Sequence, residues 1–278
     1  MPELAEVEFG RKVAEGVVVG RRVAKVWCDD DAIVFDGVRP QEVAEALTGR
    51  AVIAVCRRGK QLWFELDQGP HPLFHFGMTG AFRTREVEPL KLESTPKGGD
   101  AAWPPRFAKI RLTMDDGGEL VMTNARRLGR IRLRADPPNE APISRLGFDP
   151  LYDLPPPSRF RELVRRRKVV LKGLLLDQGF AAGVGNWVAD EVLYQAGLDP
   201  RRKACDLSDA EIDRMRAKLR SVVAKAVAVD ARKDRFPKSW LFHHRWNKDP
   251  DATTARGERV EHLTLAGRTT AWVPDAQS

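Results

Sequence analysis

Apolar and polar residues alternate with a period of two through much of the first half of the chain, as they do in β-strands. Two hairpins are expected there, at residues 52–65 and at residues 109–123, the second around a turn of two aspartates and two glycines. Before them, the apolar residues of segment 4–17 fall on one face of a helix, and Pro2 suits its first position. The pattern predicts that residues 1–135 form a mostly β domain, a sandwich with helices at its edge.

The second half changes to helical spacing after a proline-rich stretch, residues 136–158, which we interpret as a linker. A capping box of Ser208 and Glu211 precedes apolar residues at helical intervals. Strand-like alternation returns near the end, on both sides of a tight turn. We therefore expect a helical domain over residues 159–235 and a hairpin segment over residues 236–278.

Composition narrows the classes of protein that fit. Apolar residues make up 42% and charged residues 31% of the 278 positions, which excludes a wholly disordered chain. Lysine and arginine exceed aspartate and glutamate by 47 to 39, a formal net charge of +8, which makes a polyanion such as nucleic acid the leading partner. A basic protein without such a partner explains the charge equally well, because net charge reports on association and not on fold.

Segments that would direct the chain to a membrane or out of the cell are not expected. No apolar run approaches the ~18 residues that a membrane span needs, and the acidic residues near the start do not suit a secretory signal. Cys28, Cys56 and Cys205 lie far apart and form no C-x-x-C pair, so neither a disulfide framework nor a cysteine zinc site is expected. We expect a protein of a reducing, intracellular compartment with no membrane partner.

The first residues combine an amine with two carboxylates. If Met1 is removed, Pro2 exposes a secondary amine, which can form an iminium ion directly with a sugar aldehyde carbon. An α-amino group has a pKa of ~7.7–8.0 against ~10.4 for lysine, so far more of it is unprotonated at neutral pH. Glu3 and Glu6 lie three residues apart, on one helical face beside that amine. Spacing alone favours a simpler explanation, since acidic residues stabilise the first turn of any helix.

Three further segments place side chains on turns. Lys60 follows a hairpin turn, and Met78 lies in the glycine-flanked segment HFGMTG. Arg126 and Leu128 lie in the segment NARRLG, which follows a strand. Arginine with an apolar neighbour on such a loop can wedge into a base stack and replace an extruded base. Taken singly, a solvated lysine, a core methionine and a basic turn explain these segments as well.

The stretch LLLDQGFAAGVGNWVADEVLYQAGLDP, residues 174–200, indicates two helices joined by a glycine-rich turn that ends at Asn186. The N–H groups that open the second helix can bind a phosphate, although two glycines also allow tight helix packing. Arg268 is expected at the tip of the terminal hairpin. His243 and His244 are adjacent and lack matching ligands, so no metal is expected there.

Taken in sequence order, these segments resemble the formamidopyrimidine-DNA glycosylase and endonuclease VIII superfamily of base-excision repair enzymes. The matching motifs are PELAEVE, RRGKQLWFEL, HFGMTG, NARRLGRIRL, LGFDPL, the stretch 174–200, FPKSWLFHHR and LAGRTTAWVP. Several are weak alone, and their common order makes the resemblance specific. The most similar branch is the plant and fungal type, whose terminal hairpin is a zincless finger.

The resemblance implies an α+β fold of two domains. These are an N-terminal helix-flanked β-sandwich and a C-terminal helix–two-turn–helix domain that ends in a zincless β-hairpin finger. It implies a bifunctional DNA glycosylase and AP lyase that acts as a monomer on damaged double-stranded DNA, through a Schiff base and β,δ-elimination, with no cofactor and no metal. The expected compartment is the nucleoid of a bacterial cytoplasm or the nucleus of a eukaryote.

The resemblance also implies a role for each matching residue. Pro2 is the Schiff-base nucleophile, Glu3 the acid that protonates the sugar ring oxygen, and Glu6 a supporting carboxylate. Lys60 contacts phosphate and assists catalysis. The void left by the flipped nucleotide is filled by Met78, Arg126 and Leu128. The backbone phosphates are held by Lys172, Asn186 and Arg268.

The chain departs from the family pattern in places that bear on function. NARRLG replaces DPRRFG, so Leu128 stands where phenylalanine is usual, which weakens stacking between bases and alters the preference for the opposite base. Residues 227–236 lack the Gly-Gly-Thr-Thr loop that covers a flipped 8-oxoguanine, which favours formamidopyrimidine and hydantoin lesions over 8-oxoguanine. The usual four-cysteine zinc finger is absent. We expect the hairpin to be held instead by packing of Trp240, Phe242, Trp246 and Trp272.

Two alternatives stay open. An endonuclease VIII-like enzyme would prefer oxidised pyrimidines, and a comparison of formamidopyrimidine and thymine glycol duplexes separates the two. A non-catalytic DNA- or RNA-binding homologue would keep the fold. Binding alone does not need an acid beside a terminal amine, so Pro2, Glu3 and Lys60 speak against that alternative.

Overall fold

The computed structural model describes residues 2–90 and 102–278, and the chain divides into two compact units, residues 1–145 and 146–278. The division falls inside the proline-rich stretch that we interpret as a linker. Each unit has buried apolar residues and secondary structure of its own, and the predicted α+β fold of two domains is confirmed. The finer boundaries expected at residues 135, 158 and 235 remain predictions.

Unit 1, residues 1–145, contains two antiparallel four-stranded sheets. The first has the order β1 (Val23–Cys28), β6 (Ala108–Met114), β7 (Glu119–Thr123) and β5 (Ala81–Arg83). The second has the order β2 (Val52–Arg58), β3 (Gln61–Leu66), β4 (His71–His75) and β8 (Arg130–Arg134). Adjacent pairing of β2 with β3 and of β6 with β7 confirms both predicted hairpins.

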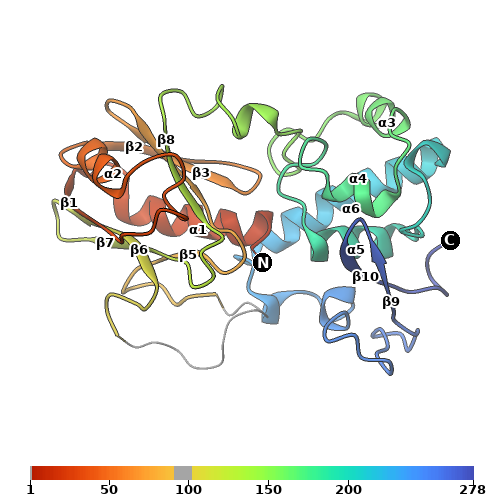
Figure 1. The fold of residues 1–278 in the computed structure, drawn as a ribbon. Coiled ribbons are helices and arrows are strands. Elements are labelled where there is room, and N and C mark those ends of the chain that lie inside the picture. The colour runs from red at the N-terminus through yellow and green to blue at the C-terminus, as the bar shows by residue number, and fades with distance from the viewer. Residues whose placement is uncertain (1, 91–101) are drawn as a thin grey trace. The chain divides into compact units, whose positions relative to one another are not determined.

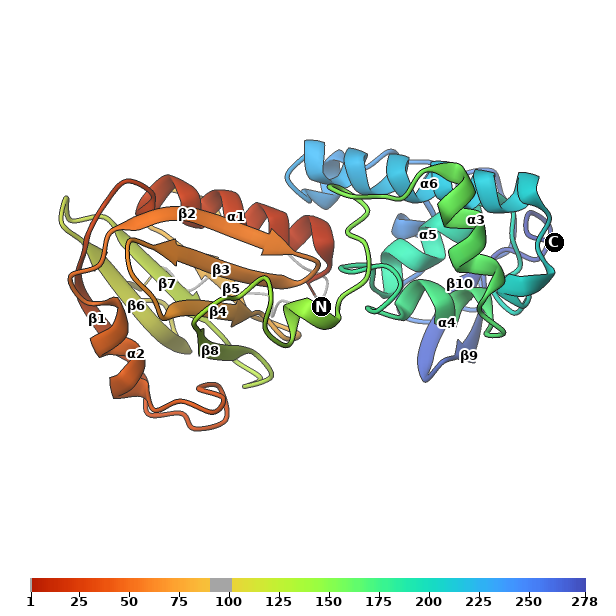
Figure 2. The same ribbon diagram turned by 90° about the horizontal axis from the view of Figure 1, so that it is seen from above.

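Two helices cover the edges of this sandwich. Helix α1 (Leu4–Val18) contacts β2 and β3 of one sheet and β5 and β7 of the other, whereas α2 (Pro40–Leu47) contacts β1 and β4. Figure 2 shows α1 running alongside β2. The expectation that Pro2 occupies the first helical position is wrong. Glu3 is the N-cap in an extended conformation, because its capping box with Glu6 fixes the start of the helix at Leu4.

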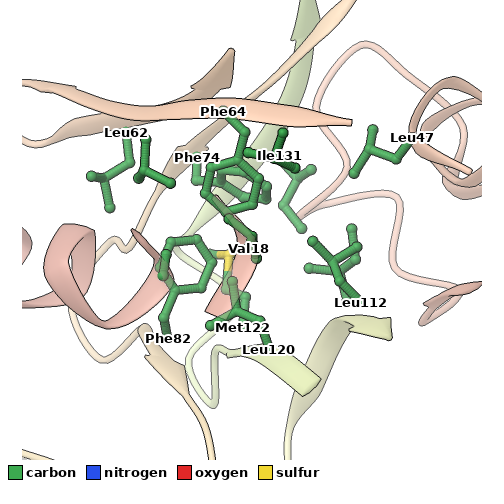
Figure 3. Packing of buried hydrophobic residues seen from close by; sticks show 14 of the residues in the cluster. Val18, Leu47, Leu62, Phe64, Phe74, Phe82, Leu112, Leu120, Met122 and Ile131 are labelled. Atoms are coloured by element: carbon green, nitrogen blue, oxygen red, sulfur yellow. The ribbon is translucent and has the colours of Figure 1, made fainter. Parts of the chain in front are cut away.

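Apolar side chains from both sheets meet in the core of unit 1. Phe64 and Phe74 from one sheet face Phe82 from the other (Figure 3), and the Phe74 and Phe82 ring centroids are 5.2 Å apart. Full burial stabilises each such side chain by roughly 1.5–3 kcal/mol. Phe74 and Phe82 lie on β4 and β5, so this core fixes both ends of the loop 76–80 that joins these strands.

Unit 2, residues 146–278, is mainly helical and ends in a hairpin (Figure 1). Its helices are α3 (Pro157–Arg165), α4 (Leu171–Leu176), α5 (Asn186–Ala196) and α6 (Asp209–Ala228). The predicted capping box of Ser208 and Glu211 starts α6. The hairpin pairs β9 (Glu261–Leu265) with β10 (Arg268–Trp272), and α5 contacts α4, α6 and β10.

Short 3-10 helices complete both units. They are η1 (Ile143–Arg145), η2 (Ala204–Asp206), η3 (Lys233–Arg235) and η4 (Leu241–His243). Among the described residues, no helix combines the length and the apolar character that crossing a bilayer requires.

Candidate functional site

The start of α1 brings Pro2, Glu3 and Glu6 together. All three are buried, and the exposed fractions of Glu3 and Glu6 are 2% and 8%. The Glu6 carboxylate accepts a hydrogen bond from the Glu3 N–H at 3.0 Å, and the Glu3 side chain faces the Glu6 N–H in return. This reciprocal capping places two carboxylates within one helical turn of Pro2.

The carboxyl of Glu6 has an unusual protonation equilibrium. Burial, and after it the neighbouring Glu3 carboxylate, raises the pKa of Glu6 from 4.5 to about 7. Hydrogen bonds from backbone N–H groups act in the opposite direction and are outweighed. A carboxyl with a pKa near neutrality can exchange a proton at the pH where an amine nucleophile must be unprotonated. The first turn of α1 therefore has acid–base capacity beyond capping the helix.

Lys60 lies in the turn between β2 and β3, and a buried ion pair fastens this turn to α1. Glu8 of α1 accepts a hydrogen bond from Arg57 Nε at 2.7 Å, and Arg57 Nη1 donates to the Gly59 carbonyl at 2.9 Å. The side chains of Glu8 and Arg57 are 4% and 0% exposed, so solvent screens the pair little. The candidate nucleophile, Pro2, lies just before α1. The position of Lys60 and the position of Pro2 are therefore both set by this helix.

Met78, Arg126 and Leu128, predicted to fill the void of a flipped nucleotide, lie on two loops that contact each other. Met78 follows β4 and is half-buried, whereas Arg126 and Leu128 follow β7 and are exposed. Thr79 Oγ1 accepts a hydrogen bond from the Arg126 N–H at 3.4 Å, and the buried Asn124 amide also joins the loops. The structure thus brings these three predicted residues to one place on unit 1.

A buried aspartate anchors the second of these loops. Asp31 accepts two hydrogen bonds from the Arg127 guanidinium, both at 2.9 Å, and pairs with Lys109 Nζ at 2.8 Å. Burial alone would raise the pKa of Asp31, but Arg127 and Lys109 outweigh it and hold the pKa well below its ordinary value. Arg127 is therefore held by this ion pair although it is exposed, like its neighbours Arg126 and Leu128.

In unit 2, Lys172 and Asn186 belong to one buried network around Asp190. The Lys172 ammonium donates to the Asn186 carbonyl at 2.8 Å and pairs with Asp190. Asp190 also accepts hydrogen bonds from Arg245 Nε and from the Ala271 N–H, each at 3.1 Å. Lys172 was expected to touch phosphate, but α5 packs against α4 and leaves its side chain no exposed surface. The hydrogen bond instead holds the Lys172 ammonium against the first residue of α5.

Asn186 begins α5 and lies against the terminal hairpin. Its Nδ2 donates to the Thr269 carbonyl at 2.8 Å, and its buried Oδ1 finds no hydrogen-bond partner among the described residues. Arg268 precedes Thr269, opens β10 and is exposed. The start of α5 therefore lies beside the strand that begins with the exposed Arg268, and a helix start with a basic residue on a neighbouring strand suits a phosphate.

Aromatic rings of the hairpin segment pack against one another and against Trp187 of α5. The cluster contains Trp187, Phe236, Trp240, Phe242 and Trp246, and the Phe242 and Trp246 centroids are 5.3 Å apart. Trp272, expected to pack with other tryptophans, is buried separately, with the Arg201 guanidinium 4.2 Å from its ring centroid. Within residues 2–90 and 102–278, no three histidine, cysteine or acidic side chains gather to hold a metal ion. Independence from metal stays a prediction.

Comparison with known proteins decides the family. The model for the formamidopyrimidine-DNA glycosylase N-terminal domain matches residues 1–131, and the model for the H2TH domain of the same enzyme matches residues 146–237. A formamidopyrimidine-DNA glycosylase of Arabidopsis thaliana is 39% identical over 277 residues, which cover 100% of this chain and 71% of the relative. The chain belongs to the formamidopyrimidine-DNA glycosylase family. The family resemblance and the enzyme class, a DNA glycosylase of base-excision repair, are confirmed.

Further family members match along the whole chain. A formamidopyrimidine-DNA glycosylase of Thermus thermophilus is 35% identical over 290 residues, which cover 100% of this chain and 98% of the relative. The crystal structure of a Lactococcus lactis formamidopyrimidine-DNA glycosylase bound to DNA with an AP site has a TM-score of 0.80 at 23% identity and covers 99% of each chain. A structure of MutM with DNA containing carbocyclic 8-oxo-G also has a TM-score of 0.80 at 23% identity, over 100% of each chain. These structures share the fold of this family member.

Sequence reasoning missed the buried residues that hold the candidate site residues of each unit in place. Asp31, Asn124 and Asp190 are all buried and fully engaged, yet none was singled out. Asp190 gave a usable signal, because it stands with Glu191 between apolar residues of α5, and an acidic side chain that is buried among apolar residues requires partners. Asn124 and Asp31 gave none, since asparagine and aspartate are ordinary loop residues.

Proposed function

We propose that this chain is a bifunctional DNA glycosylase and AP lyase that excises oxidised purines from damaged double-stranded DNA. Its preferred lesions are formamidopyrimidines and hydantoins, with 8-oxoguanine a weaker substrate. The observation that carries the proposal is the buried carboxylate pair at the start of α1, where Glu3 and Glu6 are hydrogen-bonded directly after Pro2. Binding DNA does not need such a pair beside a chain-terminal amine, whereas Schiff-base chemistry does.

The reaction begins once Met1, which lies outside the described residues, has been removed. The Pro2 nitrogen forms a bond to C1′ of the lesion nucleotide as the bond from C1′ to the damaged base breaks, and the base leaves with the bonding electrons. The Pro2 nitrogen passes its proton to the departing base, Glu3 protonates the ring oxygen, the sugar ring opens and an iminium ion remains. Loss of the acidified C2′ proton then expels the 3′ phosphate, and a second elimination expels the 5′ phosphate.

The supporting residues divide by unit. In unit 1, Glu6 holds the backbone of Glu3 through their capping hydrogen bond, and its pKa of about 7 lets it exchange protons with the site. The void left by the extruded nucleotide is filled by Met78, Arg126 and Leu128. The phosphates are held by Lys60, Asn186 and Arg268, with Lys172 positioning Asn186.

The partner we propose is damaged duplex DNA. The net charge of +8 supports it, and so does the Lactococcus lactis relative, which was solved with DNA containing an AP site. We also propose that the protein acts as a monomer and needs no cofactor or metal. It would act in the intracellular compartment that holds the genome.

Borohydride trapping on a panel of lesion duplexes tests the proposal. We expect a protein–DNA adduct whose mass maps to the N-terminal peptide, formed fastest on formamidopyrimidine and hydantoin duplexes. Pro2→Gly and Glu3→Gln should abolish it. Glu15→Gln, which changes an exposed carboxylate later in α1, is the matched control and should not.

Other results would contradict parts of the proposal. An adduct that maps to Lys60, or normal excision by Pro2→Gly, would remove Pro2 as the nucleophile. Faster excision of thymine glycol than of formamidopyrimidines would favour the endonuclease VIII-like alternative. Binding without excision of any lesion would favour a non-catalytic homologue.

A further inference from the structure

The side chain of Asn124 joins the two loops that carry Met78, Arg126 and Leu128. Asn124 follows β7 and has an exposed fraction of 0%. Its Nδ2 donates a hydrogen bond to the Phe76 carbonyl, on the first loop, at 2.8 Å. Its Oδ1 accepts from the N–H groups of Leu128 and Gly129, on the second loop, at 3.0 and 3.1 Å. One planar amide therefore spans both loops, with donor and acceptor each engaged.

The loops approach so closely around this amide that glycine is required. At Gly77, where φ is +63°, an added Cβ would lie 2.4 Å from the carbonyl carbon of Leu128. At Gly129 it would lie 2.3 Å from Asn124 Nδ2. Because the two backbones are packed this tightly, rearrangement of side chains alone cannot change the distance between the loops. The separation of the loops is therefore set by the Asn124 amide and the glycines next to it.

The side chains next to this buried junction are more exposed than the Asn124 amide. Met78 adjoins Gly77 and is half-buried, whereas Leu128 adjoins Gly129 and is 42% exposed. Arg126 is also exposed, and only its backbone N–H contacts the other loop. Among the described residues, no hydrogen bond, ion pair or ring contact joins the Met78 and Leu128 side chains, so the backbone junction must set their separation.

We propose that Asn124 is a positioning residue for lesion recognition, which sets the distance between Met78 on one loop and Arg126 and Leu128 on the other as they enter the base stack. The inference rests on the proposed function, since it assumes that these side chains replace an extruded nucleotide. Asn124 does not touch DNA; it acts through the three residues that do. A misplacement of about 1 Å can cost about 10²-fold in rate, so loss of the amide should be measurable.

The amide is needed for its donor as well as its acceptor. An ionised aspartate at position 124 could still accept from Leu128 and Gly129, but it has no proton to donate to the Phe76 carbonyl. Asn124→Asp therefore removes one of three hydrogen bonds, and protonation of the new carboxyl restores a donor. Asn124→Ala removes all three.

Single-turnover kinetics on two substrates test the proposal. On a formamidopyrimidine duplex, we expect Asn124→Ala to lower the excision rate between about 10-fold and 100-fold. On DNA with a preformed abasic site, no base must be extruded. There, the rate of strand cleavage by Asn124→Ala should fall less than about 3-fold, because the activation free energy of that step changes little. A 2-aminopurine base next to the lesion should show a correspondingly slower fluorescence change. Asn139→Ala, which changes an exposed asparagine of the same unit, is the control.

Two further variants separate positioning from folding. Asn124→Asp should lose excision relative to the wild type at pH 8 and recover it at pH 5.5, a pH dependence that general destabilisation does not produce. Asn124→Ala combined with Leu128→Ala should lose less than the product of the single effects, because both act on one step.

Several results would overturn the proposal. One is excision by Asn124→Ala within about 2-fold of the wild type, which would mean that almost no transition-state stabilisation was lost. The others are equal losses of rate on lesion and abasic DNA, and multiplicative effects in the double variant. A wild-type chain that excises no lesion at all overturns the proposed function together with this inference. If the wild type is active and the Asn124 variants excise the lesion at the same rate, only the inference is overturned.

Discussion

Replacement of Asp190 by asparagine is expected to destabilise unit 2 and to loosen its hairpin. Asp190 has 1% exposed surface and receives Lys172 from α4, Arg245 from the segment before the hairpin, and the Ala271 N–H from β10. One carboxylate thus joins three parts of the unit that are distant in sequence. Asparagine keeps the shape of the side chain but removes the charge that compensates two buried cations.

The size of the effect follows from that uncompensated charge. Removing one partner of a buried ion pair typically costs about 3–5 kcal/mol, because the other partner stays buried and desolvated. The Lys172 side chain is 0% exposed and that of Arg245 is 5% exposed, so neither can reach water without local unfolding. At about 4 °C per kcal/mol for a domain of this size, the melting temperature of unit 2 should fall by roughly 12–20 °C.

Thermal unfolding followed by near-ultraviolet circular dichroism measures this, because Trp187 and Trp240 of the aromatic cluster lie in unit 2. Hydrogen exchange of the β10 amides should also accelerate. Asp213→Asn, which breaks a partly exposed pair with Arg161, is the matched control and should change the melting temperature little. A melting temperature for Asp190→Asn within about 2 °C of the wild type, with unchanged exchange in β10, would refute the reasoning, since it corresponds to under 1 kcal/mol.

Three further predictions concern DNA binding, metal and pH. Arg268→Ala should reduce the slope of log K against log salt by about 0.9 and weaken lesion and undamaged DNA alike, as titration by fluorescence anisotropy would measure; an unchanged slope would remove Arg268 from the interface. Purification in EDTA should leave excision intact, because His243 and His262 lie 3.3 and 3.2 Å from backbone carbonyl oxygens, whereas one zinc per chain whose removal abolishes DNA binding would contradict the zincless finger. Because the pKa of Glu6 is raised from 4.5 to about 7, its contribution to stability is fully present below pH 4.5 and is lost as the pH rises through 7. Glu6→Gln should therefore flatten the free energy of unfolding between pH 5 and 8 in denaturant titrations, and an unaltered pH profile would show that another group is responsible.

The elements that the sequence predicted well are those whose cause is local. The β2–β3 and β6–β7 hairpins follow from alternation on both sides of a tight turn, and the start of α6 follows from Ser208 and Glu211, three residues apart. The order of short motifs along the chain likewise sufficed to identify the family. The spacing of Glu3 and Glu6 likewise predicted that the two carboxylates lie together, although Glu3 is the N-cap and not a helical residue. Their burial, and with it the raised pKa of Glu6, could not be derived from spacing.

The tertiary structure alone decided which polar groups are buried and what compensates them. The family resemblance implies a phosphate contact for Lys172, but α5 covers this side chain and its ammonium pairs with Asp190, 18 residues later. Asn124 is an ordinary loop residue in sequence, and only the approach of a loop 48 residues earlier gives its amide a carbonyl to hold. Burial and the partners of a buried charge depend on contacts between distant segments, whereas periodicity and capping depend on neighbours. The sequence therefore determined the elements and the chemistry available to this protein, and the packing of those elements decided which of these side chains are exposed and which are buried and hold the others in place.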